Sequence, residues 1–132
     1  MIFYFKIDKL EDHLNLYKEI DIALDTFPYN GVTTTCEALW MGVPVITLLG
    51  EQHASRVGAS ILTNVGLENF IANDIEGYIE MATTFANKID LLKKMRKGLR
   101  KKMLKSSLCN GSTFAKEIER AYKAIWAKHL NS

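Results

Sequence analysis

The residues with the clearest chemical potential lie in one short stretch, between Asp25 and Glu37. Asp25 ends an apolar run, and Asn30-Gly31 leads through Val32 to three consecutive threonines, Thr33–Thr35. If a helix starts at these threonines, its first backbone N–H groups have no intrahelical acceptor, and the helix dipole adds partial positive charge there. Hydroxyls, free N–H groups and a glycine that permits close approach predict an anion site suited to a diphosphate.

The same stretch also has a purely structural interpretation. Thr34-Thr35-Cys36-Glu37 matches the capping-box pattern, in which Thr34 and Glu37 satisfy each other's backbone N–H groups at a helix start. Because such caps are far more common than ligand sites, the tetrapeptide by itself favours the cap. The sequence contains neither the Gly-Lys-Ser/Thr of a Walker loop nor a Gly-x-Gly-x-x-Gly motif. Residue spacing therefore leaves a capped helix and a ligand site both open.

His53 and Arg56 form a second candidate group, at the start of a later helix. Cationic side chains in a first turn oppose the helix dipole unless an anion or a carboxylate compensates. Glu51 could supply that carboxylate, which would make the pair structural. The functional alternative places both side chains on the far wall of a ligand pocket.

Hydrophobic periodicity and turn residues predict the elements that must position these groups. Short apolar runs bounded by turn residues predict strands at residues 2–5, 22–24, 45–49 and 69–72. Apolar spacings of three and four predict helices at residues 10–20, 34–41, 53–65, 74–88, 90–104 and 112–130. Apolar strands that alternate with helices indicate a parallel sheet with both faces covered.

This order predicts an α/β fold, a Rossmann-like half-domain with fewer strands than a complete doubly wound sheet. With 132 residues and 48% hydrophobic content, the chain is expected to form a single domain. Residues 1–73 would form the βα core and residues 74–132 the C-terminal helices. Trp40 and Trp126 lie on apolar helix faces and are expected to pack in the core.

Positive charge is concentrated in one C-terminal helix. Residues 93–105 contain eight Lys/Arg and no acid, which leaves nine basic against fifteen acidic residues elsewhere. Nucleic acid or an acidic membrane surface would suit such a helix. However, Leu92, Met95, Leu99 and Met103 form an ordinary docking stripe, and no aromatic residue is interleaved with the charges. We therefore expect neither nucleic-acid nor membrane binding.

Composition disfavours several other classes of site and protein. Cys36 and Cys109 are too few for a disulfide framework. The three His residues lie far apart without metal-ligand spacing, so no metal site is expected, and neither His13 nor His129 is assigned a role. No apolar run reaches the roughly 20 residues of a membrane span. Two thiols and no secretory signal predict a reducing cytoplasm.

The candidate stretch lies within a longer sequence pattern. Residues 21–48, DIALDTFPYNGVTTTCEALWMGVPVITL, resemble the C-terminal catalytic domain of O-GlcNAc transferases and their bacterial relatives, the tetratricopeptide-containing, SPINDLY-like glycosyltransferases. The similarity continues through GEQHASRVGAS at residues 50–60 and HLNLY at residues 13–17. It extends over nearly the whole chain, weakening after about Asp74, and a match of this length is highly specific.

The resemblance implies the GT-B architecture, in which two Rossmann-like domains face each other and this chain is part of the C-terminal one. In that family the donor, usually UDP-N-acetylglucosamine, binds in the cleft, and an inverting, metal-independent reaction modifies Ser/Thr hydroxyls of proteins. Carried over by position, Thr33 and Thr34 would hold the diphosphate and Glu37 the ribose hydroxyls. The other expected contributors are the loop, the third threonine and the pocket wall: Asn30, Gly31, Thr35, His53 and Arg56.

Two positions differ from the animal members of the family. Those typically have His before the two threonines and Asp where Glu37 stands, whereas this chain has Val32 and Glu37. The phosphate contact from His is therefore absent, and the ribose contact is one methylene longer. Bacterial relatives often share this threonine-rich version, which indicates a subfamily trait.

The resemblance also implies what this chain lacks. The family's acceptor-side residues, general base and essential phosphate-binding Lys lie upstream, so no catalytic residue is assigned here. We expect a UDP-sugar-binding piece of a protein O-glycosyltransferase, inactive without the upstream catalytic and tetratricopeptide regions and without a cofactor of its own. The alternative is a truncated, non-catalytic binding or assembly module. Since the family's last helix braces the partner domain, residues 112–130 should either form a homodimer or pack back onto the chain.

Overall fold

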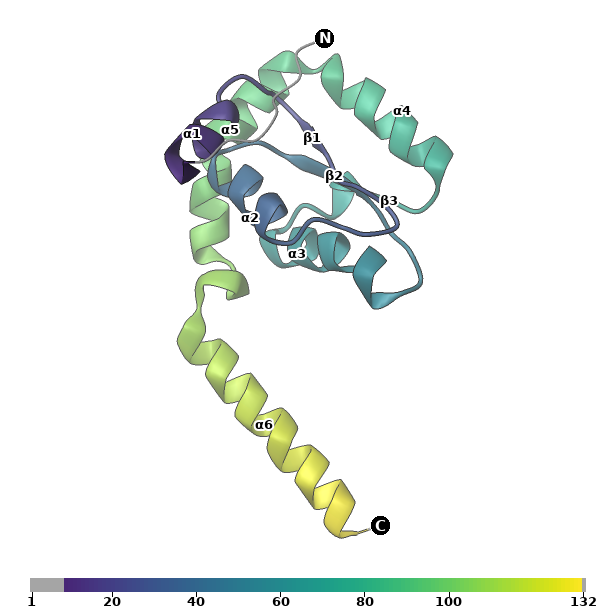
Figure 1. Ribbon diagram of the computed structural model, residues 1–132, viewed down its shortest axis with the longest axis vertical. Helices are drawn as coiled ribbons and strands as arrows, with labels where there is room; N and C mark the ends of the chain where they lie inside the picture. Colours follow the sequence, from purple (N-terminus) through teal and green to yellow (C-terminus); the bar gives the residue numbers. More distant parts are fainter. Residues whose placement is uncertain (1–8, 132) are drawn as a thin grey trace.

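A three-stranded parallel sheet organises the chain (Figure 1). The computed structural model describes residues 9–131, so the strand predicted at residues 2–5 lies outside the described part. Strand β2 lies between β1 and β3 and is parallel to both. The strands are β1 (Ala23–Leu24), β2 (Val45–Leu48) and β3 (Ile71–Ala72).

Six α-helices accompany the sheet in the described part of the chain. Helices α2 and α3 cover one face and α4 the other (Figure 1), as expected when right-handed crossovers connect neighbouring parallel strands. The predicted α/β, Rossmann-like partial domain is therefore confirmed. The helices are α1 (Leu10–Leu16), α2 (Thr33–Trp40), α3 (Val57–Val65), α4 (Ile75–Ala86), α5 (Ile89–Lys105) and α6 (Gly111–Leu130).

Three predicted boundaries are wrong because short turns with i→i−3 hydrogen bonds replace regular structure. Helix α1 ends at Leu16 rather than at residue 20, since the next N–H groups bond three residues back. A 3-10 turn at His53–Ser55 precedes α3, so the predicted helix 53–65 is split. Another 3-10 turn, Glu68–Phe70, takes the place of the first half of the strand predicted at residues 69–72.

The hydrophobic core lies between the sheet and helices α2 to α5. Phe70 stacks on Phe85 of α4, with 4.2 Å between the ring centroids. The predicted docking stripe of α5 is confirmed, since Leu92, Leu99 and Met103 are buried. The other large side chains at the centre of the core are Leu39, Val43, Ile46 and Leu62.

The basic side chains of α5 bind the ends of other helices. Carbonyl groups at helix C-termini lack intrahelical donors and carry the negative end of the dipole, so cations stabilise them. The charge concentration at residues 93–105 therefore has a structural use that its composition did not reveal. The hydrogen bonds run from Arg96 to the carbonyls of Tyr17 and Ile20, from Arg100 to that of Trp40, and from Lys102 to that of Gly66.

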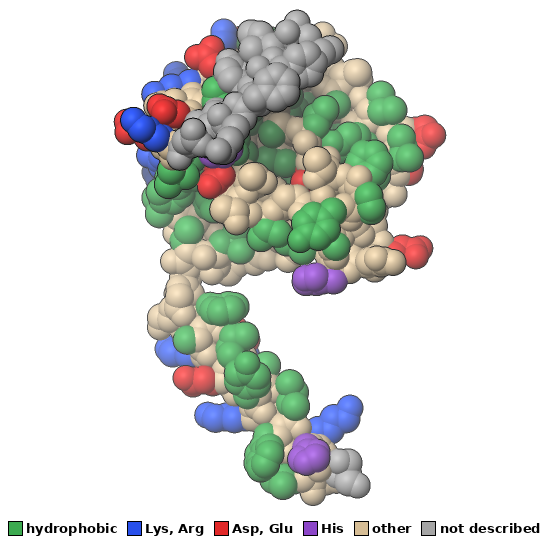
Figure 2. Space-filling model, in the orientation of Figure 1, with side chains coloured by type: hydrophobic (Ala, Val, Ile, Leu, Met, Phe, Trp, Pro, Cys, Tyr) green, Lys and Arg blue, Asp and Glu red, His purple; other side chains and the backbone are tan. Residues whose placement is uncertain are grey.

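Helix α6 extends away from the rest of the chain and contains no buried residue (Figure 1). Apolar side chains gather along it in Figure 2, each 38% to 69% exposed: Phe114, Ile118, Tyr122, Ile125, Trp126 and Leu130. Of the two arrangements expected for residues 112–130, packing back onto the chain is therefore not observed. The expected core packing of Trp126 is wrong, whereas Trp40 is partly buried against the core. None of the described helices is both long and apolar enough to cross a membrane.

A homodimer through α6 remains a prediction. We expect it because an isolated amphipathic helix is only marginally stable in water and an exposed apolar face favours association. Ile125 lies near the centre of the apolar face, and helical periodicity places Ala127 on the opposite face. We expect the chain to sediment as a dimer and Ile125→Glu to weaken the dimer by at least about tenfold, since it buries a charge. The matched control Ala127→Glu should leave dimerisation unchanged. A monomeric parent chain at micromolar concentration would contradict this prediction.

Candidate functional site

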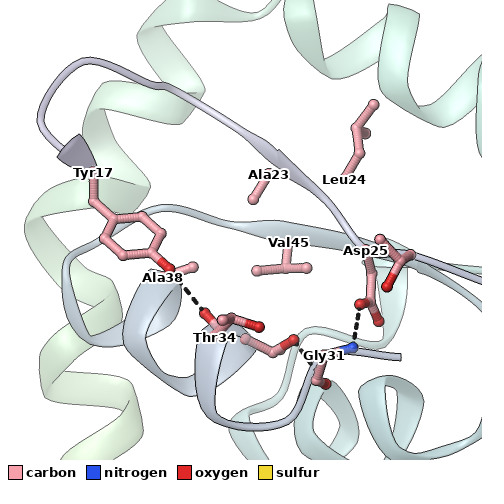
Figure 3. A pocket seen from close by; sticks show the side chains of 10 residues that line it. Tyr17, Ala23, Leu24, Asp25, Gly31, Thr34, Ala38 and Val45 are labelled. Atoms are coloured by element: carbon pink, nitrogen blue, oxygen red, sulfur yellow. Dashed lines mark hydrogen bonds between the residues drawn. The ribbon is translucent and has the colours of Figure 1, made fainter. Parts of the chain in front are cut away.

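A cavity of about 140 Å³ lies at the carboxyl end of β1, beside the start of α2 (Figure 3). This is the edge of a parallel sheet at which ligands bind in open α/β folds. Loop and helix residues from the predicted stretch therefore meet strand residues around one space. The lining residues are Tyr17, Ala23, Leu24, Asp25, Thr26, Gly31, Thr34, Thr35, Ala38 and Val45.

The carboxylate of Asp25 connects the strand end to its surroundings. It is buried, and it accepts hydrogen bonds from the backbone N–H of Gly31 at 2.8 Å and the hydroxyl of Thr47 at 2.7 Å. Its backbone carbonyl accepts from the hydroxyl of Tyr78 at 2.8 Å, and burial, followed by the charge of Asp25, raises the pKa of Tyr78. Asp25 thus ties together β1, β2, α4 and the loop before α2.

Asn30 fixes the loop from the other side. Its side chain is 1% exposed, donates to the carbonyl of Thr26 at 3.0 Å and accepts from the N–H of Gly58 at 3.2 Å. Its own N–H donates to the carbonyl of Ala54 at 2.9 Å. Both polar atoms of the side chain are therefore engaged within the protein, and Asn30 serves the site by holding the loop against the first turn of α3.

The start of α2 differs from the capping-box alternative. The helix begins at Thr33, one residue earlier than predicted, and Val32 at its N-cap position provides no side-chain hydrogen bond. Thr35 is buried and donates to the carbonyl of Gly31 at 3.0 Å. Thr33 and Thr34 are exposed. The capping box is therefore wrong, and two threonine hydroxyls remain at the helix start.

Gly31 is required at its position by the close packing of these threonines. A Cβ atom on Gly31 would lie 2.5 Å from the hydroxyl oxygen of Thr34 and 3.0 Å from that of Thr35. Such contacts are too short for any side chain without movement of its neighbours. The glycine therefore allows the loop to pass directly beside the hydroxyl groups, as the sequence pattern predicts.

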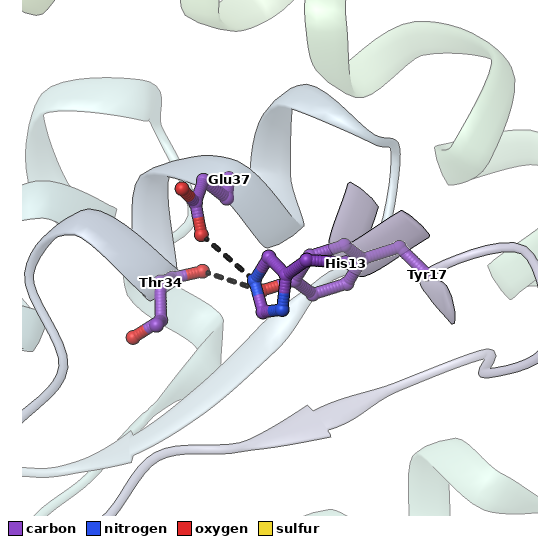
Figure 4. Close-up of polar contacts among 4 residues, drawn as sticks. All are labelled: His13, Tyr17, Thr34 and Glu37. Atoms are coloured by element: carbon purple, nitrogen blue, oxygen red, sulfur yellow. Dashed lines mark hydrogen bonds and ion pairs between the residues drawn. The ribbon is translucent and has the colours of Figure 1, made fainter. Parts of the chain in front are cut away.

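Glu37 pairs with His13, a residue to which no role was assigned from the sequence (Figure 4). The Nε2 atom of His13 lies 3.1 Å from Oε2 of Glu37. The ring of His13 also meets that of Tyr17 edge to face, with centroids 5.5 Å apart, and the hydroxyl of Tyr17 donates to the carbonyl of Thr34. Burial, followed by the charge of Glu37, raises the pKa of Tyr17. Helix α1 thus holds α2 at two points beside the candidate site.

His53 and Arg56 are both exposed and line neither the cavity at the start of α2 nor the neighbouring one beside Pro28. Nη1 of Arg56 donates to the carbonyl of Gly50 at 2.9 Å. The partner of the Arg56 guanidinium is therefore a backbone carbonyl rather than the carboxylate of Glu51. A role of His53 and Arg56 in a pocket wall stays a prediction. Within residues 9–131 no group of three His, Cys, Asp or Glu side chains is arranged to hold a metal ion.

Known proteins resemble the chain over most of its length. A family model described as Glycosyl transferase family 41 matches residues 1–118. Two plant proteins, each described as a probable UDP-N-acetylglucosamine–peptide N-acetylglucosaminyltransferase SPINDLY, match over 120 residues, with 45% identity in Hordeum vulgare and 47% in Solanum lycopersicum. These matches cover 91% of this chain and 13% of each relative.

A solved structure supports the same relationship. A mutant O-GlcNAc transferase of Thermobaculum terrenum matches with a TM-score of 0.79 and 41% sequence identity. The match covers 87% of this chain and 22% of that one. The chain therefore spans only a small part of the length of the proteins it resembles.

The packing around Asp25 generates a test of stability. A Cβ atom on Gly58 would lie 2.3 Å from Oδ2 of Asp25 and 2.4 Å from the hydroxyl oxygen of Thr47. We expect Gly58→Ala to lower the free energy of unfolding by about 2 kcal/mol, because it separates a buried hydrogen-bonded pair. Urea denaturation measures the change.

Gly98 of α5 provides the matched control, because it is also helical and a Cβ atom there would have no neighbour within 4 Å. Gly98→Ala should raise the free energy of unfolding by about 0.5–1 kcal/mol, since alanine is the better helix former. Equal effects of the two substitutions would show that the Asp25–Thr47 contact does not constrain the fold.

Proposed function

The chain belongs to glycosyl transferase family 41, and on this premise we propose that it binds the diphosphate of a UDP-sugar donor at the start of α2. The donor proposed is UDP-N-acetylglucosamine, and the acceptor in the longer protein is a Ser or Thr hydroxyl of a polypeptide. The names of the plant relatives refer to the same nucleotide sugar and to a peptide, which supports both substrates.

The observation that carries this proposal is the uncapped start of α2. Val32 offers no side-chain acceptor, and the first turn of the helix contains no acidic residue. The first N–H groups therefore lack side-chain partners, and the dipole makes this end attractive to an anion. The hydroxyls of Thr33 and Thr34 stand at the same end and can donate to phosphate oxygens.

Glu37 is proposed to accept hydrogen bonds from the ribose hydroxyls. It lies one helical turn beyond Thr33 and Thr34, so its carboxylate can reach a group attached to the bound diphosphate. The contact with His13 uses Oε2, which leaves Oε1 for the ribose. His13 is proposed as a positioning residue, because it fixes one rotamer of the longer Glu side chain.

The chemistry proposed for these residues is binding and stabilisation of the departing diphosphate. Helix N–H groups and hydroxyls can neutralise charge on a leaving nucleotide without a metal ion, so no cofactor is proposed. No residue of this chain is proposed as general base. Transfer is assigned to the longer protein, in which upstream catalytic and tetratricopeptide regions would complete the cleft.

A second candidate function rests on α6. Its apolar face is exposed along the whole helix, as an element that binds a partner would be. In this alternative the chain is a non-catalytic assembly module that no longer recognises a nucleotide sugar. Titration of UDP and UDP-N-acetylglucosamine separates the two, because only the donor-binding function predicts amide shifts confined to residues 33–37. Absence of binding at millimolar UDP would exclude donor recognition by this chain.

Thr34 and Thr35 provide a matched pair of substitutions. Thr34→Ala should weaken UDP binding by about tenfold, through loss of a hydrogen bond to a charged oxygen, and change stability by less than about 0.5 kcal/mol. Thr35→Ala should instead lower the free energy of unfolding by about 1 kcal/mol, because its buried bond to Gly31 is lost. Calorimetric titration and urea denaturation measure the two quantities. Unchanged UDP affinity in Thr34→Ala would refute the diphosphate assignment.

The ribose assignment can be tested with a ligand that lacks the relevant hydroxyls. Glu37→Gln should weaken UDP binding by about five- to tenfold, because hydrogen bonds to a charged acceptor are stronger than those to a neutral one. The same substitution should leave the affinity for 2′,3′-dideoxy-UDP unchanged. If both ligands lose affinity equally, Glu37 acts on the fold of α2 rather than on the ribose.

A further inference from the structure

A second cavity, of about 340 Å³, lies where the ends of α1 and α2 meet α5. Four of its lining side chains are cationic: Lys18, Arg96, Lys97 and Arg100. Trp40 provides an apolar wall, and none of the described residues that line the space is a carboxylate. We refer to these four side chains together with Trp40 as the cationic pocket.

Within residues 9–131 no carboxylate forms an ion pair with the cationic pocket. None of its four cationic side chains has a carboxylate within 4.0 Å in the described part of the chain, where the ion pairs are His13–Glu37 and Glu117–Arg120. The C-terminal ends of α1 and α2 offset part of the charge, with about half an elementary charge each. A clear excess of positive charge remains over a small concave surface.

Hydrogen bonds to backbone carbonyls hold Arg96 and Arg100 in place and leave some of their N–H donors unused. Arg96 donates to the carbonyls of Tyr17 and Ile20, and Nε of Arg100 donates to that of Trp40. Since a guanidinium group has five N–H donors, both arginines retain donors for a ligand. The guanidinium of Arg100 also lies over the Trp40 ring, 4.8 Å from its centroid, which further fixes its position.

The backbone brings these groups together closely. Gly42 has φ +87°, and a Cβ atom there would lie 2.7 Å from the carbonyl oxygen of Arg96. Only glycine permits this approach of α5 to the end of α2, so the arginines are presented from a rigid junction. Lys18 and Lys97 line the same cavity, and their side chains make no hydrogen bond within the described residues.

We propose that the cationic pocket binds the phosphate group of a small anionic metabolite, at a site separate from the donor site. Paired guanidinium donors match phosphate oxygens, and the two lysines add charge. The volume lies within the range of small-molecule sites. Helix α2 separates the two sites, because the donor diphosphate is assigned to its N-terminus and the cationic pocket lies at its other end, about 12 Å away.

Inorganic pyrophosphate is the test ligand, and Trp40 is the reporter. The chain has two Trp residues, so in Trp126→Phe the fluorescence comes from Trp40 only. Its emission should change with pyrophosphate concentration and reach a plateau.

In the Trp126→Phe background, Lys18→Gln with Lys97→Gln should weaken pyrophosphate binding by about tenfold, since two charges beside the ligand are removed. Lys93→Gln with Lys101→Gln is the matched control, with the same charge loss on α5 outside the cavity, and should change affinity less than about twofold.

Four results would overturn the proposal. One is a Trp40 signal that does not saturate, and another is an equal loss of affinity in the two double variants. The third is loss of the Trp40 signal in Thr33→Ala with Thr34→Ala, which would place the anion at the start of α2 instead. Binding of a single-stranded oligonucleotide more than about tenfold tighter than pyrophosphate would indicate a nucleic-acid surface and would also reject a small-anion site.

Discussion

Burial of the Asp25 carboxylate is the constraint on which the site depends. A carboxylate removed from water must have its oxygens hydrogen-bonded, and here the partners are the N–H of Gly31 and the hydroxyl of Thr47. One partner belongs to the loop before α2 and the other to the central strand. The carbonyl of the same residue receives the hydroxyl of Tyr78 from α4, on the opposite face of the sheet. One residue therefore sets the register between the sheet, the site loop and the returning helix.

The two ends of the helices have different electrostatic surroundings. At the C-terminal ends of α1, α2 and α3, cationic side chains of α5 satisfy backbone carbonyls, so the negative dipole ends are neutralised within the protein. At the carboxyl edge of the sheet, the positive end of α2 carries threonine hydroxyls and no carboxylate cap. The carbonyls at these C-terminal ends therefore have partners within the protein, whereas the first N–H groups of α2 have no side-chain partner among the described residues.

Much of this organisation could be predicted from sequence, and the failures share a physical cause. Apolar runs and turn residues identified the parallel sheet, and the helix predicted at residues 74–88 starts where expected, with Asp74 accepting a hydrogen bond from the N–H of Gly77. The pairing of His13 with Glu37 could not be predicted, because 24 residues separate them and helical periodicity does not specify which helix is the neighbour. The carbonyl partners of the α5 cations were missed for a related reason, since backbone acceptors have no sequence signature. The exposed face of α6 was missed because periodicity shows that a face is apolar but not what covers it.

The failure of the capping box is itself an argument for a ligand at the start of α2. Helices α4 and α6 have side-chain caps, and α1 and α5 have acidic residues in their first turns. The first turn of α3 receives the side-chain oxygen of Asn30. Among the six α-helices of the described chain, α2 alone has none of these. Its available acceptors are directed elsewhere, since Glu37 contacts His13, and valine at an N-cap position is unfavourable. The other helix starts thus have a side-chain or charge partner for their N–H groups, and the start of α2 has none. The hydroxyls of Thr33 and Thr34 lie beside it, so an anionic substrate bound there would supply the missing acceptor.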